Sequence, residues 1–320
     1  MVEQIKENIF LVTLDTIKAE NLLEYKNILR MASDLQKKIS VKLFQECIFV
    51  FANTDTKYPI YERPIFEVKT EGYKKRILIW IGEESGSLPS DELLTKFDLI
   101  FKAYMRQEYP EKHLYAMPMI LPSEVPVQDV IPMSMKKYNV FFSGNLNRNR
   151  ISMFAALNSK MSWWQRLLQP FYGGKGGTRL LKLVYGGKDF DISDEVQNSV
   201  LRFNNGFNTG LTKDEYARIT ANSKIILSPR GFSSTECFRI YESMRQGAVV
   251  INEKLPNVPH YHNIPIVQIK SWKHIKKLIT ELTNDIAYLE KMSAEAIQFY
   301  NEKLSIEAIS NMIVAKVNDL

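Results

Sequence analysis

The residues best suited to chemistry lie in the stretch from Ser223 to Asn252, SKIILSPRGFSSTECFRIYESMRQGAVVIN. Arg230 and Arg239 carry permanent positive charge, and a guanidinium can hold two phosphate oxygens at once. Glu242 follows Arg239 by three residues, so the two would be neighbours on a helix, and a carboxylate can accept hydrogen bonds from two hydroxyl groups of a ribose. The stretch therefore predicts a site for a phosphate and a sugar diol.

Glu236 has two interpretations in this stretch. It follows Ser233 by three residues, which is the spacing of a capping box, and this predicts a helix that begins there and ends at Gly247 after about twelve residues. Glu236 then either caps the helix or contacts the ligand. Arg239 and Glu242 likewise either bind the ligand or form a surface ion pair.

The same stretch has the pattern of a strand, a loop, a helix and a second strand. The runs 225–227 and 248–251 are apolar throughout, as expected for strands that are covered on both faces of a parallel sheet. Ligands of such sheets bind beyond the carboxyl ends of the strands, which is where Arg230 and Gly231 fall. The free N–H groups of the following helix would also favour an anion there.

The order of strand, Pro-Arg-Gly, Ser/Thr-rich loop, Arg239, Glu242 and GAVVIN resembles the C-terminal half of exostosin-like glycosyltransferases. The resemblance implies an α/β chain with the GT-B fold, which has two Rossmann-like domains with a cleft between them. It implies an inverting transfer of a sugar from a nucleotide-diphosphate sugar, with donor contacts from Arg239 and Glu242. A glycan or glycolipid acceptor and a role in surface polysaccharide or lipopolysaccharide synthesis follow from the same resemblance.

A second candidate for the donor site lies upstream. The apolar run 138–142 predicts a strand, and it leads into Ser143 and Gly144 and then into Arg148 and Arg150 at the start of a helix. A glycine-bearing turn with cations at a helix start can hold a diphosphate. It also matches the exostosin-like pattern of Phe-x-Gly followed by Arg. Arg148 and Arg150 are either donor ligands or surface cations.

A strand at 77–81 runs straight into Gly82, Glu83 and Glu84, which places two carboxylates at the end of a strand. The stretch 76–119 resembles the acceptor domain of inverting fucosyltransferases. The resemblance implies that Glu83 is the general base, which would take the proton from the acceptor hydroxyl. Glu84 is the second choice. In the alternative interpretation, Glu83 and Glu84 have no catalytic role and are solvated acids in a loop or acids in the first turn of the next helix.

Strand and helix patterns divide the chain into domains. Residues 1–120 are expected to form an N-terminal acceptor-binding Rossmann-like domain, and the proline-rich residues 121–136 a linker. Residues 137–284 are expected to form the nucleotide-sugar-binding Rossmann-like domain. The final segment, 285–320, predicts a helix that can cross back to the N-terminal domain.

The segment 160–188, KMSWWQRLLQPFYGGKGGTRLLKLVYGGK, interleaves aromatic and aliphatic residues with lysines and arginines. The favoured interpretation is a helix that packs its aromatic face on the domain. Peripheral contact with an anionic membrane is the second interpretation, because such surfaces attract apolar side chains flanked by cations. A mobile lid over the donor is the third.

The composition is that of an ordinary folded protein, with 45% hydrophobic and 24% charged residues in a chain of 320. The distant cysteines Cys47 and Cys237 predict neither a disulfide framework nor a metal site. Asp189 and Asp191 are the nearest approach to a metal-binding DxD motif, and they fall in a predicted loop. We therefore expect no obligatory metal and no cofactor beyond the nucleotide-sugar donor.

No apolar run is long enough to span a bilayer, and the N-terminus lacks the order of a signal peptide. These features predict a cytoplasmic protein, with the option of a peripheral position at the inner face of the membrane. The formal net charge of +6 favours acidic partners such as nucleotide sugars. A non-catalytic protein that binds nucleotide sugars or glycans is the alternative function, and nucleic-acid binding is disfavoured because no basic-aromatic module is recognised.

Overall fold

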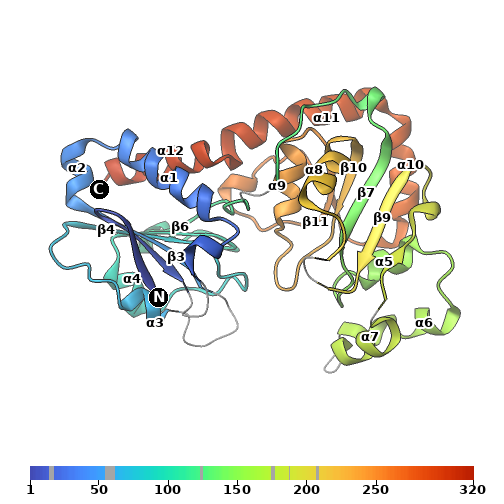
Figure 1. Cartoon of the computed structure of the whole chain (residues 1–320), viewed down its shortest axis with the longest axis horizontal. Coiled ribbons are helices and arrows are strands. Elements are labelled where there is room, and N and C mark those ends of the chain that lie inside the picture. Colours follow the sequence, from blue (N-terminus) through green and yellow to red (C-terminus); the bar gives the residue numbers. More distant parts are fainter. Residues whose placement is uncertain (14–17, 55–61, 123–124, 174–176, 187, 207–208) are drawn as a thin grey trace. The chain divides into compact units, whose positions relative to one another are not determined.

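The computed structural model describes residues 1–13, 18–54, 62–122, 125–173, 177–186, 188–206 and 209–320. The chain forms two compact units (Figure 1). Unit 1 comprises Met1–Glu124, Pro256–Ile264 and Tyr300–Leu320. Unit 2 comprises Val125–Leu255 and Pro265–Phe299.

Unit 1 is built on a six-stranded sheet whose strands follow one another in sequence order. The strands are β1 (Val2–Lys6), β2 (Ile9–Thr13), β3 (Cys47–Asn53), β4 (Lys75–Trp80), β5 (Leu99–Lys102) and β6 (Leu114–Ala116). β1 is antiparallel to β2, and all other neighbours are parallel. The central strands β3 and β4 are apolar and buried, which is why their sequences lack the alternation of a half-exposed sheet.

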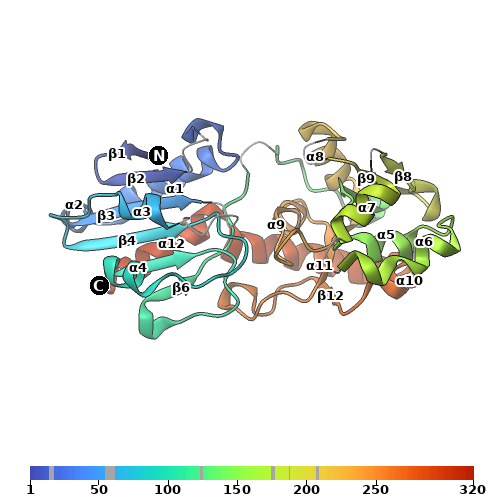
Figure 2. The same cartoon turned by 90° about the horizontal axis from the view of Figure 1, so that it is seen from below.

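Helices cover both faces of this sheet. They are α1 (Tyr25–Lys38), α2 (Val41–Glu46), α3 (Arg63–Phe66), α4 (Asp91–Lys96) and α12 (Ile306–Asn318). α1 and α12 lie on one face, and α3 and α4 on the other (Figures 1 and 2). α1 forms because Ile28, Met31, Ala32 and Leu35 recur at helical spacing and are all buried.

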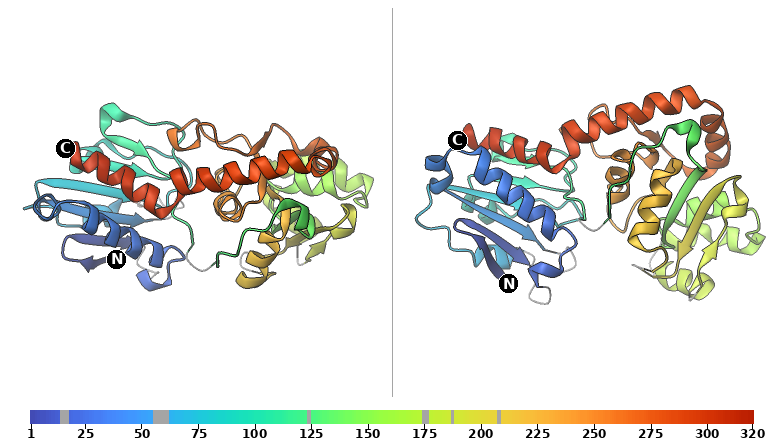
Figure 3. Two further views of the ribbon diagram at one scale, coloured as in Figure 1. Left: turned by 90° about the horizontal axis from the view of Figure 1, so that it is seen from above. Right: turned by 45° about the horizontal axis from the view of Figure 1, so that its top comes forward.

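The end of the chain belongs to unit 1. α12 runs beside α1 in the view from above (Figure 3), and the Lys38 Nζ donates a hydrogen bond to the Asn311 Oδ1 at 2.7 Å. α11 (Ile286–Phe299), which precedes it in the chain, belongs to unit 2. The structure therefore divides the predicted C-terminal segment 285–320 between the two units, and the first passage from unit 1 to unit 2 falls after Glu124, inside the predicted linker 121–136.

Unit 2 is also built on a six-stranded sheet, in the order β12-β11-β10-β7-β9-β8. Its strands are β7 (Tyr138–Asn145), β8 (Phe190–Asp191), β9 (Ser199–Asn204), β10 (Ser223–Ser228), β11 (Val249–Glu253) and β12 (Val267–Ile269). Only the edge pair β8–β9 is antiparallel. β10 and β11 pair in parallel register, Ile225 opposite Val249, which makes Ser223 to Asn252 the predicted crossover unit.

The strand order contains a switch point. The chain leaves β7, pairs next with β9 on one side of it, and then returns to form β10 on the other side. In sheets of this kind, the connections from two neighbouring strands run in opposite directions and leave a crevice beyond their carboxyl ends. The crevice of unit 2 is therefore expected at the ends of β7 and β10.

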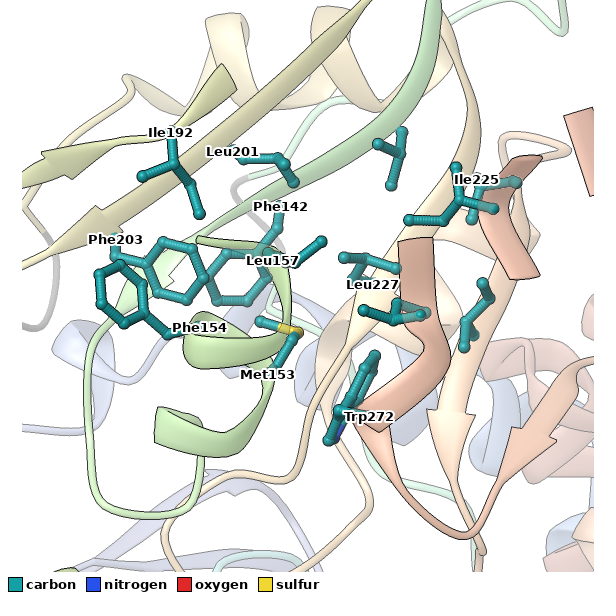
Figure 4. Close-up of a cluster of buried hydrophobic side chains, with 14 of the residues drawn as sticks. Phe142, Met153, Phe154, Leu157, Ile192, Leu201, Phe203, Ile225, Leu227 and Trp272 are labelled. Carbon is teal, nitrogen blue, oxygen red and sulfur yellow. The ribbon is translucent and has the colours of Figure 1, made fainter. Parts of the chain in front are cut away.

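Helices cover both faces of the unit 2 sheet as well. They are α5 (Ile151–Leu157), α6 (Trp163–Leu167), α7 (Gly177–Tyr185), α8 (Lys213–Ala221), α9 (Phe238–Met244), α10 (Ile275–Asn284) and α11. The larger core lies on the face of Phe142, where Met153, Phe154 and Trp272 pack against the strands (Figure 4). The opposite face packs Phe141 against Tyr216 of α8, with ring centroids 5.4 Å apart.

The expected fold class, α/β with two Rossmann-like domains, is confirmed by these two sheets. The predicted helix that begins at Ser233 is wrong, because α9 begins at Phe238 and has only seven residues. Within the described residues, no helix has the length and apolar character required to cross a membrane.

Candidate functional site

The site in unit 2 is built where β7 and β10 end side by side. β7 finishes with Ser143, Gly144 and Asn145, and β10 finishes at Ser228, directly before Pro229 and the predicted Arg230. Because the two strands are parallel neighbours, their carboxyl ends open on the same edge of the sheet. Two of the predicted donor motifs, 143–150 and 229–242, therefore meet at the switch point.

Arg239 is the cation of α9 that reaches this edge. Its side chain is buried, and its Nη2 donates a hydrogen bond to the carbonyl oxygen of Ser143 at 2.9 Å. The guanidinium carbon lies 4.9 Å from the centre of the Phe142 ring, which gives the charge an aromatic face to rest on. The Nε of Arg239 has no hydrogen-bond partner. Arg239 is thus held in position with donor capacity to spare.

Arg150 approaches the same ring from the start of α5. Its side chain is buried, its Nη1 donates to the carbonyl oxygen of Asn145 at 2.9 Å, and its guanidinium carbon lies 5.8 Å from the Phe142 ring centre. Burial, and after it the neighbouring charge of Arg239, lowers the pKa of Arg150 to about 10. Because its side chain is buried, the interpretation of Arg150 as a surface cation is wrong. Burial and the like charge of Arg239 both make the positive form of Arg150 costly.

Gly144 allows the two guanidiniums to sit together. A Cβ on this residue would lie 3.0 Å from the Nη2 of Arg239, 3.1 Å from the Nη1 of Arg150 and 3.3 Å from the ring of Phe142. Such contacts are tighter than side chains normally make, so a larger residue would push the two cations away. The predicted residues Ser143, Gly144, Arg150 and Arg239 are thus brought together at one point.

Arg230 and Gly231 line the other side of this point. The carbonyl oxygen of Arg230 accepts a hydrogen bond from the Nε of Arg150 at 3.4 Å, and that of Gly231 accepts one from the Nδ2 of Asn149 at 2.6 Å. The added Cβ of an alanine at Gly231 would meet only the oxygen of Ser234, at 3.7 Å. The fold itself leaves this position open.

Unsatisfied polar atoms gather at the same edge. Buried side-chain atoms without a hydrogen-bond partner there are Asn147 Nδ2, Ser228 Oγ, Arg230 Nε, Arg239 Nε and Asn252 Oδ1. Buried polar groups are nearly always paired, because each unpaired group loses its hydration without compensation. Their concentration beyond the ends of β7, β10 and β11 indicates a place where a polar ligand completes the hydrogen bonding.

The two predicted carboxylates of this site are both buried. The Oε2 of Glu242 accepts a hydrogen bond from the hydroxyl of Tyr216 at 3.2 Å, and burial raises the pKa of Glu242. Although Arg239 is on the same short helix, no ion pair joins the two described side chains, so the interpretation of a surface pair is wrong. The Oε2 of Glu236 accepts from the hydroxyl of Ser234 at 3.1 Å, which replaces the predicted capping box with Ser233.

Arg148 points to a different part of the edge. It is exposed and lines a pocket of about 610 Å³ in unit 2. The walls of the pocket combine polar, basic and apolar residues: Asn145, Leu146, Asn147, Arg148, Thr178, Leu181, Lys182, Tyr185, Gly186, Lys188, Asn205, Phe232 and Ser233. The pocket therefore adjoins the arginine pair through Asn145, and no acid is among these residues.

Glu83 in unit 1 has surroundings that differ from those of a free base. Its Oε2 forms an ion pair with the Nζ of Lys102 at 2.6 Å, and both side chains are fully buried. It also accepts hydrogen bonds from the backbone N–H groups of Ser85 at 2.9 Å and Ser87 at 2.8 Å. Although burial alone would raise it, the pKa of Glu83 is lowered by Lys102 and these hydrogen bonds. A carboxylate so fully engaged is a weak proton acceptor.

No sequence pattern indicates Glu24, which lies at the same edge of the unit 1 sheet. Its Oε2 accepts a hydrogen bond from the Nδ2 of Asn53, the last residue of β3, at 3.3 Å. Burial raises the pKa of Glu24, and the nearby exposed Glu84 raises it further. Glu24 comes just before α1, and only the fold brings it beside the strand end that Glu83 and Glu84 follow.

The only candidates for a metal site that the sequence offered are Asp189 and Asp191. In the parts of the chain that the structure describes, no three His, Cys, Asp or Glu side chains are grouped so that they could hold a metal ion. Of the predicted near-DxD pair, Asp191 forms an ion pair with Arg202 at 3.3 Å, and Asp189 accepts a hydrogen bond from the N–H of Asn205 at 2.7 Å. Independence from metal stays a prediction.

Comparison by sequence gives no relatives, because no known family pattern and no curated protein matches the chain. Comparison by structure finds TarM, with a TM-score of 0.48 and 11% identity over 90% of this chain and 57% of TarM. It also finds WaaG, a glycosyltransferase involved in lipopolysaccharide biosynthesis, with a TM-score of 0.45 and 8% identity over 92% and 95% of the two chains. HepE of Anabaena in complex with UDP-glucose has a TM-score of 0.45 and 10% identity over 85% and 79%. The chain thus spans little more than half of TarM and nearly all of WaaG.

Proposed function

We propose that the protein is a glycosyltransferase that binds a nucleotide-diphosphate sugar at the carboxyl edge of the unit 2 sheet. The observation that supports this most is the pair of buried guanidiniums, Arg150 and Arg239, neither of which forms an ion pair with a carboxylate among the described residues, although the charge of Glu242 contributes to raising the pKa of Arg239. Two buried like charges repel each other and are costly to keep. A bound diphosphate would neutralise both and use their spare donors.

The same pair would serve catalysis. When the bond from the anomeric carbon to the diphosphate oxygen breaks, negative charge grows on the leaving diphosphate. Fixed cations aimed at that charge stabilise the transition state more than the ground state. Arg150 and Arg239 are held by backbone carbonyls and by the Phe142 ring, so they need little reorganisation. This arrangement would also allow the transfer to proceed without a metal ion.

The acceptor hydroxyl needs a proton acceptor, and an inverting transfer is the mechanism we propose. The oxygen of the acceptor hydroxyl attacks the anomeric carbon from the face opposite the diphosphate, and the proton of this hydroxyl moves to a carboxylate. The resemblance to fucosyltransferases assigns this role to Glu83, but the Lys102 ion pair occupies that side chain. Glu24 is the stronger candidate, because it forms no ion pair with the described residues and burial raises its pKa. Glu84 is exposed beside it.

The acceptor proposed from the resemblance is a glycan or a glycolipid, in the synthesis of surface polysaccharide or lipopolysaccharide. A glycolipid acceptor would place the protein at the inner face of a membrane, in the cytoplasm. A second candidate function is a non-catalytic protein that binds nucleotide sugars or glycans, and the engaged state of Glu83 favours it. The two candidates share donor binding and differ in turnover.

A thermal-shift screen against nucleoside diphosphates and their sugars tests donor binding, because a ligand that binds only the folded state raises the Tm. We expect one nucleoside diphosphate to raise the Tm more than its monophosphate does, since the monophosphate lacks the second phosphoryl group. A protein whose Tm responds to none of them would not fit the proposal.

Incubation of the matching nucleotide sugar with candidate glycans then separates the two functions. A transferase releases nucleoside diphosphate in proportion to the glycan that is extended, and NMR of the product reports inversion at the anomeric carbon. Binding without release over many hours, with every acceptor supplied, would favour the non-catalytic function.

A further inference from the structure

The segment 160–188 holds an exceptional share of the charge of the protein. It contains six lysines and arginines and no aspartate or glutamate. The other 36 lysines and arginines of the chain are matched in number by its 36 aspartates and glutamates. The six cations of this segment therefore equal the whole net charge of +6. A local excess of this kind attracts an anionic partner even though the rest of the protein is neutral.

The same segment exposes large apolar side chains. Their exposed fractions are 74% for Trp163, 46% for Trp164, 62% for Leu167, 64% for Phe171 and 84% for Leu183. The favoured expectation, a helix that packs its aromatic face on the domain, is therefore wrong for these residues. Exposed aromatic and aliphatic groups that gather in one place mark interaction surfaces in folded proteins.

The exposure is built into the fold. Tyr172, Leu181 and Tyr185 are buried in the unit 2 core, so the apolar side chains on the outside are displayed by elements that are anchored from within. The guanidinium of Arg166 adds a second anchor, because its Nη1 donates to the carbonyl oxygen of Ala155 at 3.1 Å. In Figure 1, α6 and α7 stand away from the strands of the sheet.

The cations of this segment differ in whether they already have partners within the protein. Lys160 forms an ion pair with Asp194, and Arg166 is occupied by backbone carbonyls, so neither is available to a partner. Arg179 and Lys182 of α7 are exposed and form no ion pair with the described residues. Free positive charge therefore lies on the same helix as the exposed Leu183.

We propose that the segment 160–188 docks the protein on the surface of an anionic lipid bilayer. Tryptophan favours the interface between headgroups and acyl chains, and leucine and phenylalanine beside it can enter the acyl boundary. Arg179 and Lys182 would contact anionic headgroups, which attract each nearby cation. A nucleic acid would use the charge but not the aliphatic groups, and a protein partner would need no anionic lipid. Trp163, Phe171 and Arg179 are not among the residues that line the pocket beside the donor site, although Lys182 is.

Co-sedimentation of the full chain with vesicles tests the docking. We expect binding to phosphatidylcholine vesicles that contain phosphatidylglycerol, much weaker binding to phosphatidylcholine alone, and a blue shift of tryptophan fluorescence as indole leaves water. Trp163→Ser combined with Phe171→Ser should weaken the anionic-vesicle affinity by roughly tenfold or more, because each removes an interfacial apolar group. Val41→Ser combined with Met135→Ser is the matched control, since these side chains are 74% and 72% exposed elsewhere.

A charge reversal keeps the test valid if the apolar variant folds poorly. Arg179→Glu should weaken binding to anionic vesicles severalfold, whereas Lys277→Glu on α10 makes the same change in net charge and should have little effect. Both variants should keep the wild-type Tm. The proposal is overturned if wild-type protein ignores anionic vesicles, binds neutral vesicles equally well, or binds as before when Trp163, Phe171 or Arg179 is replaced.

Discussion

Two glycines illustrate how single residues shape the candidate donor site. Gly144 is required by its neighbours, because a Cβ there would press on the guanidiniums of Arg150 and Arg239. Gly231 is not required by any neighbour, and its position stays open. A glycine that the fold does not need fits a place where a ligand approaches the backbone closely.

Substitution of Gly231 by alanine separates folding from binding. We expect Gly231→Ala to keep or slightly raise the free energy of unfolding, by up to about 1 kcal/mol, because alanine restricts the unfolded chain. Nucleoside-diphosphate affinity should fall by roughly tenfold, since the new methyl group occupies the approach. Urea unfolding and calorimetry measure the two effects, and an unchanged affinity would remove Gly231 from the site.

The buried pair of Glu83 and Lys102 predicts a stability effect. Glu83→Gln leaves a buried ammonium without its partner, so we expect the free energy of unfolding to fall by about 3 to 5 kcal/mol. The pKa of Glu83 is lowered in the folded state, so the pair stabilises the fold above the ordinary carboxyl pKa and loses that stability as pH falls through the lowered pKa. Urea titrations at several pH values measure both effects.

The double variant Glu83→Gln with Lys102→Met is the control for this pair. Removing both charges should cost much less than removing one, because no charge is left uncompensated. If Glu83→Gln alone keeps full stability and abolishes transfer, the carboxylate acts in catalysis and the structural interpretation of the pair fails.

Glu24 predicts the acid limb of the pH profile. A base must be deprotonated to act, and burial and Glu84 raise the pKa of Glu24, so kcat/KM should fall as pH drops through a value above the ordinary carboxyl pKa. Glu24→Gln should lower kcat by about a hundredfold or more while donor affinity stays unchanged. A variant that retains most of its activity with the same pH profile would exclude Glu24 as the base.

Among the elements, α9 departs most from its sequence pattern. The spacing of Ser233 and Glu236 predicts a capping box, but the Ser234 hydroxyl bonds to the Glu236 carboxylate and accepts from its N–H at 3.1 Å. This local ring keeps the segment out of the helix, which begins only at Phe238. The anion site therefore depends on arginine side chains, because so short a helix offers little dipole.

The N-cap of α12 is expected to contribute to the stability of unit 1. The Ser305 Oγ accepts a hydrogen bond from the N–H of Ala308 at 3.1 Å and so caps α12, which packs on α1. Ser305→Ala should lower the free energy of unfolding by about 1 kcal/mol, whereas Ser305→Thr should lower it far less. Thermal unfolding of both variants checks the cap, and equal Tm values would show that α12 is held by packing alone.

For the whole molecule, the sequence predicts what depends on local pattern. Apolar runs identify β4, β7, β10 and β11, and the polar residues that follow them identify Gly144, Arg150 and Arg239. The strands are predicted correctly and these residues come together because parallel strands place their carboxyl ends on one edge whatever the other contacts are, while their role as donor ligands stays a prediction.

The rest depends on contacts between distant parts of the chain. Glu24 meets Asn53 only when β3 is in place, and Lys102 meets Glu83 only through the pairing of β4 with β5. The return of Pro256–Ile264 to unit 1 has no local signal either. Net charge also leaves out where the charges lie. It is a sum over the whole chain, so it does not show that cations are concentrated in 160–188.

The most direct test of the account is calorimetric titration of nucleoside diphosphate into the wild-type protein, Arg239→Ala and Arg202→Ala. Arg202 is the matched control, because it is an exposed arginine of unit 2 in a surface ion pair with Asp191. Loss of charge-assisted hydrogen bonds from a buried guanidinium should cost about 1.5 to 3 kcal/mol, or roughly ten- to a hundredfold in affinity. We predict that loss for Arg239→Ala and wild-type affinity for Arg202→Ala. Equal affinity of all three proteins would contradict the claim that the buried arginine pair binds the diphosphate.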